Sequence, residues 1–435
     1  MESIKDKVKR RVSDFLDELE GEVGTLPKFA HNLKDNNEKI YYSGPLFDKD
    51  ELSAAIESLV AGKWLATGEC VARFEKKFSK HIDTKYSVMV NSGSSANLVM
   101  VGAAKKFFKW EDGDEIIVSP VGFPTTIAPI VQHNLKPVFI DIEFDSLNFN
   151  LDLLEKSITD KTKAIFVSPV LGNPPDMDKI VSIAEKYQLR IIMDGCDSLG
   201  TKWDDKELNL YSDVTSCSFY PAHHITTGEG GMVSSNYKEL IDIARSMAWW
   251  GRDCYCIGTA NLLPCGTCGK RFDKWLDNVE VEIDHKYVFT NIGYNLKPLD
   301  LQGNIGLEQL KKIDKVHSLR REYKKVIQEF FNKIPGIKEA KTCDKANPSW
   351  FGVPIICDNA ELKQRLVKYL EDNNIQTRTY FAGNILLHPG YKHLDDYKKY
   401  PLSNEVLSRV FFVGCSPTYN DQHIKYIEKV VGDFK

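Results

Sequence analysis

The sequence predicts an α/β fold in which a large domain with a mostly parallel sheet is followed by a smaller α+β domain. Two patterns predict it. Between residues 50 and 310, short apolar runs alternate with stretches of helical periodicity, as in α/β units. From about residue 311 this alternation stops and a long helical pattern begins. The 435 residues, 42% hydrophobic and 27% charged, provide enough apolar material for a large core.

The same patterns set the expected domain boundaries. We expect an N-terminal helical arm over residues 1–45, a large α/β domain over 46–310 with a cysteine-rich loop at 252–290, and a small C-terminal α+β domain over 311–435. Residues 1–24 are the helix of the arm, because apolar side chains recur among charges at Ile4, Val8, Val12, Phe15, Leu16 and Leu19.

The elements of the two domains follow from their apolar runs. Six runs are the expected strands of the large domain: Tyr86–Val90, Glu115–Ser119, Pro137–Asp141, Ala164–Pro169, Arg190–Asp194 and Thr215–Phe219. The intervening stretch Asp176–Tyr187 predicts a helix. A helix over Ile313–Phe331 opens the small domain, whose further elements are expected at Trp350–Cys357, Gln376–Tyr380 and His423–Gly432. Because ligands bind at the carboxyl ends of parallel strands, residues that follow the strands are candidates for a site.

Charge and hydropathy exclude several classes of function. A formal net charge of -4 provides no basic surface for nucleic acid or an anionic membrane. No apolar run is long enough to span a bilayer, and Met1–Asp6 is too polar for a signal peptide. We therefore expect a cytoplasmic protein that binds neither nucleic acid nor membrane. In that reducing compartment, ten cysteines predict metal or redox chemistry more than disulfides.

The segment Ser218–Gly231 has the pattern of a strand end followed by a polar, glycine-rich loop, and it contains His223. An imidazole titrates near neutral pH and serves well as a general base. A lone histidine in a loop is more often a buried group whose hydrogen bonds are satisfied. On the residues alone, both interpretations stand.

A second polar segment, Asn91–Asn97, lies between an expected strand and a helix that should begin near Ala96. Gly93 allows tight backbone geometry, while Ser94 and Ser95 place hydroxyls beside the N–H groups of a helix N-terminus. Such a cradle binds phosphate. The alternative is a simple helix cap, which is the commoner use of serine and glycine at this place.

Two further side chains come after expected strands. Asp194 ends the apolar run Ile191–Met193, where a carboxylate is costly unless it is paired. The alternative is a loop or N-cap aspartate. Phe123 follows another strand, where an aromatic ring either faces a ligand or packs in the core.

Taken in order, these segments resemble the sugar aminotransferases of the DegT/DnrJ/EryC1/StrS family. These are pyridoxal phosphate (PLP) enzymes of fold type I, with an aspartate-aminotransferase-like fold. In that family a Ser-Phe-x-x-x-Lys run precedes Thr-x-Gly-Glu-Gly-Gly, and here His223 occupies the lysine position. A lysine forms a Schiff base with the cofactor aldehyde, whereas an imidazole does not. The resemblance therefore implies a non-covalently held cofactor, PLP or pyridoxamine phosphate (PMP).

The resemblance also implies roles for the matching positions. Those at cofactor contacts are Gly93, Ser94, Ser95, Phe123, Asp194, Asp197, Ser218 and Asn295. Asp194 would pair with the pyridine nitrogen, Phe123 would stack on the ring, and Ser218 would contact the phosphate. Asn295 would reach the phosphate of a neighbouring subunit, which implies a homodimer. Asp197 lies where relatives have Gln or His near the cofactor oxygen, and its role is left open.

Four of the cysteines lie close together in one loop: Cys254, Cys256, Cys265 and Cys268. Their spacing suits a zinc site or a [2Fe-2S] cluster. Cys196, two residues after Asp194, favours the cluster, because a thiolate there would place an electron carrier next to the cofactor.

With these cysteines included, the chain resembles the CDP-4-keto-6-deoxy-D-glucose 3-dehydrases, the iron-sulfur branch of the sugar 3-dehydratases. The matching runs are Asp194–Asp197, Tyr220–Thr226, Arg252–Cys256 and Asp284–Tyr287. The resemblance implies the cluster ligands Cys196, Cys254, Cys256 and Cys268. The loop is longer in this chain, so Cys265 is an alternative to Cys268 as the fourth ligand.

The resemblance finally implies a reaction. PMP and a [2Fe-2S] cluster would remove the C3 hydroxyl of a CDP-linked 4-keto-6-deoxyhexose, giving a 3,6-dideoxy-4-ketosugar for surface polysaccharide. His223 would act as the base, and a separate NAD(P)H-dependent flavin/iron-sulfur reductase would supply electrons. Two alternatives are a cluster-free 3-dehydratase of the GDP-sugar type, which recycles PMP with glutamate, and a non-catalytic protein that binds a sugar nucleotide.

Overall fold

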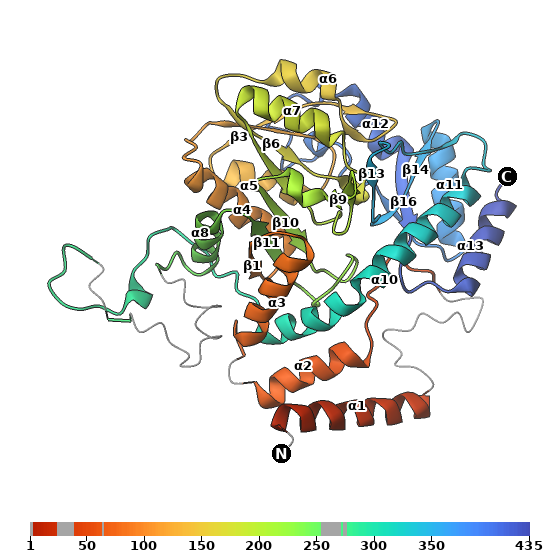
Figure 1. Cartoon of the computed structure of the whole chain (residues 1–435). Helices are drawn as coiled ribbons and strands as arrows, with labels where there is room; N and C mark the ends of the chain where they lie inside the picture. Colours follow the sequence, from red (N-terminus) through yellow and green to blue (C-terminus); the bar gives the residue numbers. More distant parts are fainter. Residues whose placement is uncertain (1–2, 24–38, 63–64, 254–270, 273–275) are drawn as a thin grey trace.

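The computed structural model describes residues 3–23, 39–62, 65–253, 271–272 and 276–435. Its centre is a seven-stranded sheet with the order β1-β11-β10-β7-β6-β2-β3 (Figure 1). The strands are β1 (Tyr86–Val90), β11 (Gly231–Ser235), β10 (Val214–Ser218), β7 (Arg190–Asp194), β6 (Thr162–Val167), β2 (Glu115–Val118) and β3 (Lys136–Phe139). Within this sheet only β11 runs antiparallel to its neighbours, which confirms the predicted α/β class with a mostly parallel sheet.

Alternate residues of each strand point to opposite faces of the sheet, and in these strands both sets include apolar side chains. Helices therefore cover both faces and bury these side chains. Val88 and Val90 pack in the core formed with α4 (Gly93–Phe107), α5 (Pro124–Gln132) and α8 (Lys238–Ala248). Met89 points to the other face, toward α3 (Glu69–His81) and α10 (Asp300–Phe331). The helices α7 (Met177–Tyr187) and α6 (Leu151–Leu154) cover the rest of that face.

A second, four-stranded antiparallel sheet lies beside the end of α10, in the blue part of Figure 1. Its strands, in order, are β12 (Ile337–Glu339), β14 (Gly352–Cys357), β16 (Val410–Gly414) and β15 (Thr377–Thr379). It packs against α10, α11 (Ala360–Asp372) and α13 (Asp421–Asp433), and α12 (Pro401–Arg409) precedes β16. This arrangement confirms the predicted α+β character of the C-terminal part. The proposed domain boundary at 310/311 falls inside α10, and the division into domains stays a prediction.

The remaining elements are short or lie at the N-terminus. The predicted N-terminal helix is α1 (Ile4–Val23), which packs on α2 (Lys49–Ala61) below α10 (Figure 1). Short strands are β4 (Ile142–Glu143), β5 (Asn148–Phe149), β8 (Lys202–Trp203), β9 (Lys206–Glu207) and β13 (Ala346–Asn347). Single 3-10 turns are η1 (Glu155–Ser157), η2 (Val170–Gly172), η3 (Leu208–Tyr211), η5 (His285–Tyr287), η6 (Ile385–Leu387) and η7 (Tyr397–Lys399). None of the described helices combines the length and the apolar character that a membrane crossing requires.

Two predicted helix starts are wrong. Helix α4 begins at Gly93 and not near Ala96, because the Ser92 hydroxyl accepts a hydrogen bond from the backbone N–H of Ser95 (3.0 Å) and caps the helix. Helix α10 begins at Asp300 and not at Ile313. The Gln302 side chain accepts a bond from the N–H of Leu299 (2.7 Å) at this start. The strands β11 and β16 were not predicted.

Helices α10 and α3 cross closely at two glycines. A Cβ atom on Gly303 would lie 2.4 Å from the backbone nitrogen of Val71, and one on Gly306 would lie 2.6 Å from the Phe74 ring. The carboxylate of Asp300 also accepts bonds from the N–H groups of Gly68 (2.9 Å) and Val71 (3.0 Å). The start of α10 is thereby fixed against the main sheet.

We expect Gly303→Ala to lower the free energy of unfolding by about 1–3 kcal/mol, because the backbone of α3 cannot move away from the added methyl group without repacking. Gly432 is the matched control, since it lies in α13 and a methyl group added there would have no atom within 4 Å. Gly432→Ala should be neutral or stabilising by up to about 1 kcal/mol. Urea denaturation followed by circular dichroism measures both, and equal effects would contradict the close crossing.

Candidate active site

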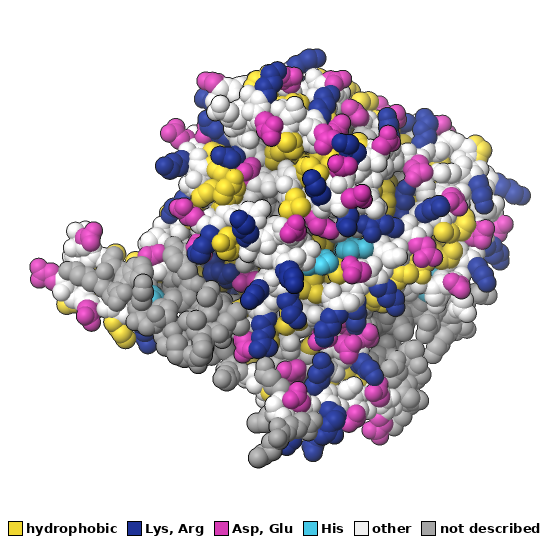
Figure 2. Space-filling model, viewed as in Figure 1, with side chains coloured by type: hydrophobic (Ala, Val, Ile, Leu, Met, Phe, Trp, Pro, Cys, Tyr) yellow, Lys and Arg dark blue, Asp and Glu magenta, His cyan; other side chains and the backbone are white. Residues whose placement is uncertain are grey.

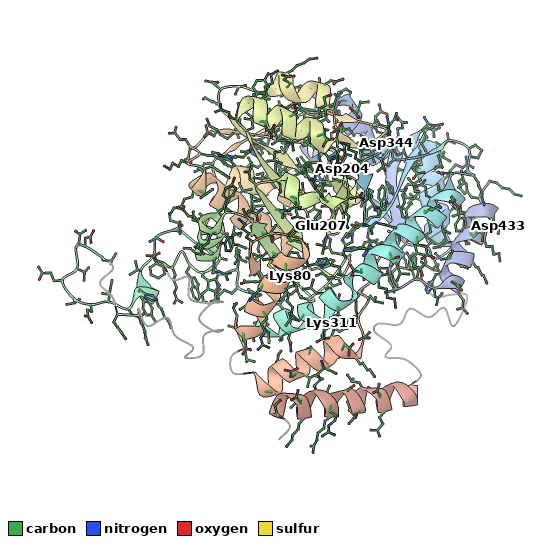
Figure 3. The ribbon with its side chains drawn as sticks, in the orientation of Figure 1. Lys80, Asp204, Glu207, Lys311, Asp344 and Asp433 are labelled. Atoms are coloured by element: carbon green, nitrogen blue, oxygen red, sulfur yellow. The ribbon has the colours of Figure 1, made fainter. Side chains whose placement is uncertain are left out.

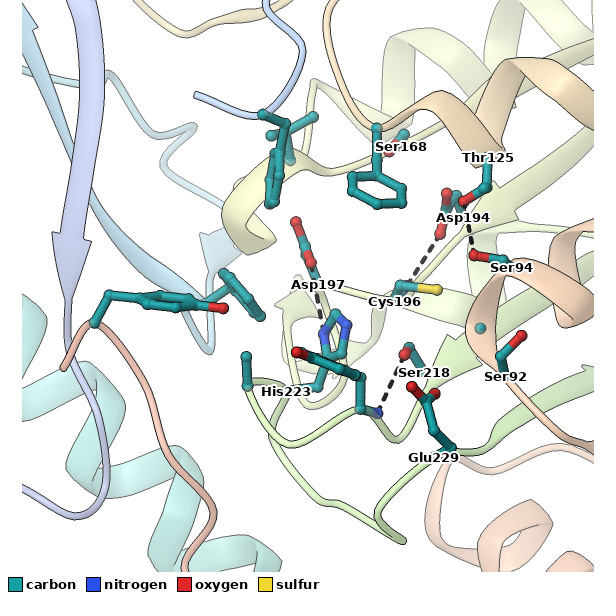
Figure 4. Close-up of a pocket in the computed structure, with 18 residues that line it drawn as sticks. Ser92, Ser94, Thr125, Ser168, Asp194, Cys196, Asp197, Ser218, His223 and Glu229 are labelled. Carbon is teal, nitrogen blue, oxygen red and sulfur yellow. Dashed lines mark hydrogen bonds and ion pairs between the residues drawn. The ribbon is translucent and has the colours of Figure 1, made fainter. Parts of the chain in front are cut away.

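A cavity of about 330 Å³ opens at the carboxyl ends of β1, β2, β6, β7 and β10 (Figure 4). Its lining residues are Tyr42, Ser92, Gly93, Ser94, Phe123, Thr125, Ser168, Val170, Asp194, Cys196, Asp197, Ser218, Tyr220, Ala222, His223, Glu229, Phe351 and Phe381. Phe351 precedes β14 and Phe381 follows β15, so the second sheet closes one side. This is the edge of the sheet at which the sequence predicts a ligand.

One end of the cavity is built by the first turn of α4. A Cβ atom on Gly93 would lie 2.5 Å from Cβ of Ser218 and 3.1 Å from Sγ of Cys196, so only glycine allows this approach. The Ser94 hydroxyl donates to Thr125 Oγ1 (3.3 Å) at the same end. Ser95 does not line the cavity, and its hydroxyl accepts a bond from Ser92 (2.9 Å). The N–H groups of a first helical turn have no partner within the helix and favour an anion.

Asp194 is buried at the end of β7, where its carboxylate is held in one orientation. Oδ2 accepts bonds from Asn97 Nδ2 (2.8 Å) and Thr126 Oγ1 (2.6 Å). Ser216 Oγ donates to Asn97 Oδ1 (2.6 Å), which fixes the orientation of that amide. Oδ1 receives only longer contacts, from the N–H of Cys196 (3.3 Å) and from Ser216 Oγ (3.4 Å). Oδ1 therefore has capacity for a donor in the cavity.

His223 lies in the turn after β10, and its backbone N–H donates to the carbonyl of Tyr220 (2.9 Å). Its ring is tilted against that of Phe351, with 4.9 Å between centroids. Nδ1 is 3.6 Å from Asp197 Oδ1 and has no hydrogen-bond partner (Figure 4). Burial, together with the charge of Arg320, lowers the pKa of His223 to about 3, opposed by a hydrogen bond with the backbone of Cys196. At neutral pH the imidazole is thus uncharged and able to accept a proton.

Asp197 faces His223 across the cavity. Its Oδ2 accepts a bond from the N–H of Leu171 (3.1 Å). Burial is the main cause that raises the pKa of Asp197 to about 7; the nearby carboxylate of Asp194 acts in the same direction, while the Leu171 bond and the charge of Arg320 oppose the rise. The sequence left the role of Asp197 open, and the structure places its carboxylate beside the His223 ring.

Phe123 lies on the cavity wall and not in the core. Its side chain is 50% exposed and meets the ring of Phe381 edge-on, at 5.9 Å and 84°. A half-exposed aromatic face on a cavity is suited to a flat ring as ligand. Phe351 and Phe381 come from the C-terminal region and have no motif around them, so sequence reasoning did not find them.

Of the expected metal ligands, the structure describes Cys196, which lines the cavity with Sγ 3.9 Å from Ser216 Oγ. Burial raises the pKa of this thiol well above its usual value, and the Asp194 carboxylate adds to the rise. The other expected ligands and the alternative lie outside the described residues: Cys254, Cys256, Cys268 and Cys265. Among the residues that are described, no group of three or more His, Cys, Asp or Glu side chains could hold a metal ion.

Asn295 is exposed and does not line the cavity of its own chain. Its backbone pairs with that of Trp249 in an isolated bridge. The expected contact of Asn295 with a neighbouring subunit stays a prediction.

The family model of the DegT/DnrJ/EryC1/StrS aminotransferases matches residues 47–432. The chain belongs to this family. It is 38% identical over 401 residues to dTDP-4-dehydro-2,6-dideoxy-D-glucose 3-dehydratase of Saccharopolyspora spinosa, covering 90% of this chain and 86% of the relative. It is 35% identical over 401 residues to lipopolysaccharide biosynthesis protein RfbH of Salmonella typhimurium, covering 90% and 91%.

Among solved structures of this family, the chain is similar to GDP-4-keto-6-deoxy-D-mannose-3-dehydratase of E. coli with bound hydrated PLP. The TM-score is 0.79 at 29% identity, and the match covers 91% of this chain and 100% of that one. This similarity confirms the predicted fold type I of PLP-dependent enzymes.

Two further histidines lie behind the His223 turn. His224 Nε2 is hydrogen-bonded to Ser349 Oγ (2.9 Å), and the ring of His224 is 5.5 Å from that of His317 on α10. In the described part of the chain neither ring nitrogen of His317 has a hydrogen-bond partner. His317 lines a second cavity of about 300 Å³ together with Glu207, labelled in Figure 3. Figure 2 shows histidine side chains at the centre of this face, between acidic and basic groups.

Burial lowers the pKa of His317 to about 3, helped by the charge of Arg321. The unfolded chain binds this proton near pH 6.5, so stability is lost as the pH falls below about 6.5. We expect the loss from this one residue to reach about 2 kcal/mol at pH 5. His317→Leu should therefore give a shallower fall in the free energy of unfolding between pH 7 and pH 5, measured by urea denaturation. The exposed His393→Leu is the control and should keep the wild-type slope.

Proposed function

We propose that this protein is a PMP- or PLP-dependent 3-dehydratase of a nucleotide-linked 4-keto-6-deoxyhexose. The observation that carries the proposal is His223, which lies in the cavity at the family's lysine position with Nδ1 unpartnered. Among the described residues that line the cavity there is no lysine. The relatives named above as 3-dehydratases support the same reaction class.

The cavity has groups suited to the phosphate, the pyridine nitrogen and the ring face of a B6 cofactor. The cradle at Gly93 and Ser218, which a Cβ atom would fill, is placed for the phosphate. Asp194 Oδ1 is placed for the protonated pyridine nitrogen, and Phe123 provides a ring face. When bound, the cofactor supplies an electron sink and an amino group that attaches the 4-keto sugar.

The protein's own side chains have distinct tasks in this proposal. His223 Nδ1 accepts the proton that is removed before the C3 hydroxyl leaves, since it is the unpartnered ring nitrogen and the imidazole is uncharged at pH 7. Asp197, close to Nδ1, is placed to stabilise the imidazolium that results. Phe351 and Phe381 narrow the cavity and limit the access of water.

We further propose that the reaction is completed by reduction. Loss of water from C3 followed by the addition of two electrons and two protons gives a 3,6-dideoxy-4-ketosugar and leaves the cofactor unchanged. Electrons would come from NAD(P)H through a separate flavin/iron-sulfur reductase to a [2Fe-2S] cluster on Cys196, Cys254, Cys256 and Cys268. The position of Cys196 on the cavity wall supports this assignment. The proposed substrate is CDP-linked, and the product is destined for surface polysaccharide.

Two alternative functions keep the same cavity. A cluster-free 3-dehydratase of the GDP-sugar type would take its electrons from glutamate, and the similarity to the E. coli structure favours it. A non-catalytic protein would bind the sugar nucleotide without turnover. Reaction with CDP-, GDP- and dTDP-linked 4-keto-6-deoxyhexoses, each with glutamate or with a reductase and NADH, separates the three.

The active form is proposed to be a cytoplasmic homodimer. Large apolar side chains are exposed near the end of α2 and along the segment before α10: Leu59, Val60, Leu65, Phe289, Ile292, Tyr294 and Leu299. Ile292 is 97% exposed, a state that is unfavourable for an aliphatic side chain in water. A second copy placed there would bring its Asn295 toward the phosphate cradle of the first.

We expect the wild-type protein, incubated with PLP and reduced with borohydride, to carry no covalently bound cofactor on any peptide that contains residues of the cavity. His223→Lys should gain one phosphopyridoxyl group at residue 223, because a lysine bonds covalently to the cofactor aldehyde. His223→Asn is the control, with no adduct and a dehydration rate lowered by about 10²–10⁴-fold. Peptide mass spectrometry and product analysis measure these effects, and a cavity adduct on the wild type would refute the non-covalent cofactor.

The cluster is tested by metal content. Protein purified without oxygen should contain about two iron and two sulfide ions per chain and give an EPR signal on reduction. Cys196→Ala and Cys268→Ala should lose the signal, whereas Cys265→Ala and the buried control Cys217→Ala should keep it. If the EPR signal is lost in Cys265→Ala but kept in Cys268→Ala, the fourth ligand is Cys265 and not Cys268. Absence of iron, or the presence of zinc, would exclude the cluster and leave the cluster-free dehydratase and the non-catalytic protein, which the turnover assay separates.

A further inference from the structure

Arg320 is a fully buried side chain at the centre of α10. Its three shortest hydrogen bonds all go to backbone carbonyl oxygens: those of Phe351 (2.9 Å), Ala222 (2.9 Å) and His223 (3.1 Å). One guanidinium therefore holds two segments that are distant in the sequence, the turn after β10 and the residue before β14.

This arrangement is costly for a purely structural residue. A buried guanidinium loses its hydration, and burial lowers the pKa of Arg320. In the described part of the chain no carboxylate forms an ion pair with it within hydrogen-bond distance. The planar fork of arginine suits several carbonyl oxygens at fixed angles, which a lysine ammonium on a flexible chain does not reproduce.

Two of the three carbonyls that Arg320 holds belong to residues whose rings are in contact. His223 and Phe351 have ring centroids 4.9 Å apart. The imidazole Nδ1 has no partner, so no permanent hydrogen bond from this atom orients the ring. A general base must keep such a lone pair free, so the ring is oriented by its hydrogen bond with the Cys196 backbone, by the backbone of its own turn and by packing. Arg320 fixes the backbone on both sides of that contact.

We propose that Arg320 is a positioning residue, which holds the turn of His223 and the start of β14 together so that the unpartnered Nδ1 stays 3.6 Å from Asp197 Oδ1 at the cavity wall. The chemical consequence rests on the proposed function, since positioning matters for a base that moves a proton. The geometric part does not depend on it. Displacement of a reacting group by about 1 Å costs on the order of 10²-fold in rate.

The test compares Arg320→Lys, which keeps a cation but not the planar fork, with Arg321→Lys as the matched control. The neighbouring Arg321 donates to the carbonyls of Pro348 (3.1 Å) and Gly200 (2.7 Å), so its replacement also removes a guanidinium from backbone acceptors but leaves the His223 turn untouched. The histidine ring signal in NMR spectra of the cofactor-free protein, assigned by its absence in His223→Asn, reports the position of His223 without any turnover.

We expect Arg320→Lys to shift or broaden the His223 signal and to lower kcat by about 10–100-fold with KM changed less than about threefold. Arg321→Lys should leave the signal and kcat within about twofold of wild type. A wild-type signal and kcat in Arg320→Lys would show that charge alone suffices and would overturn the proposal. If neither the wild type nor any variant forms product, the proposed function is wrong. The NMR comparison then still decides whether Arg320 positions His223.

A second variant covers the case in which Arg320→Lys does not fold. Phe351→Leu keeps Arg320 and its carbonyl acceptors but removes the aromatic contact with His223. It should shift the His223 signal and lower kcat in the same direction as Arg320→Lys. An unchanged signal in a folded Phe351→Leu protein would show that this contact does not orient the imidazole, and the proposal would be wrong.

Discussion

The whole cavity depends on the close approach of α4 to the end of β10 and β11. A Cβ atom on Gly93 would overlap Ser218, and one on Gly231 would lie 2.3 Å from the carbonyl oxygen of Ser92. Because glycine occupies both positions, the helix N-terminus, the carboxyl end of the strand and the thiol of Cys196 share one small volume. The phosphate cradle, the buried carboxylate and the histidine turn are all arranged around this contact.

Burial determines the electrostatics of the site. It raises the pKa of Asp197 and of Cys196, and it lowers that of His223. The shifts have opposite directions for acids and bases but the same effect, because each disfavours the charged form. Arg320 keeps its charge because carbonyl oxygens surround it. The protein therefore presents a neutral imidazole beside acids whose charged forms are disfavoured and beside aromatic rings.

The sequence was sufficient for those parts of the fold that depend on local patterns. β1 and β7 were predicted to the residue, since each is a short, mostly apolar run bounded at its carboxyl end by a polar residue, Asn91 after β1 and Asp194 in β7. The start of α10 was misplaced because its first turn is polar and is stabilised by a tertiary contact between Asp300 and α3. β16 was missed because its run, Val410–Gly414, follows a helix with no turn signal between them.

The site residues divide in the same way. Gly93, Ser94, Phe123, Asp194 and His223 were found from motifs and their resemblance to the family, Asp197 and Ser218 from the resemblance alone, and the structure brings all seven to one cavity. Asn97 and Thr126 were missed, although each lies inside or beside a segment that was singled out, because a hydrogen bond between distant segments leaves no sequence pattern. Phe351 and Phe381 depend on how the second sheet is placed, which local periodicity does not encode. The roles of these residues remain proposals.

The loop between β10 and β11 closes on itself through its own backbone. The N–H of Phe219 donates to the carbonyl of Gly230 (2.9 Å), and that of Thr227 donates to the carbonyl of Phe219 (3.0 Å). Neither bond involves the side chain at position 223. Side chains of different chemistry can therefore occupy position 223 while the hairpin keeps its shape, so a change of reaction at this position would need no remodelling of the scaffold.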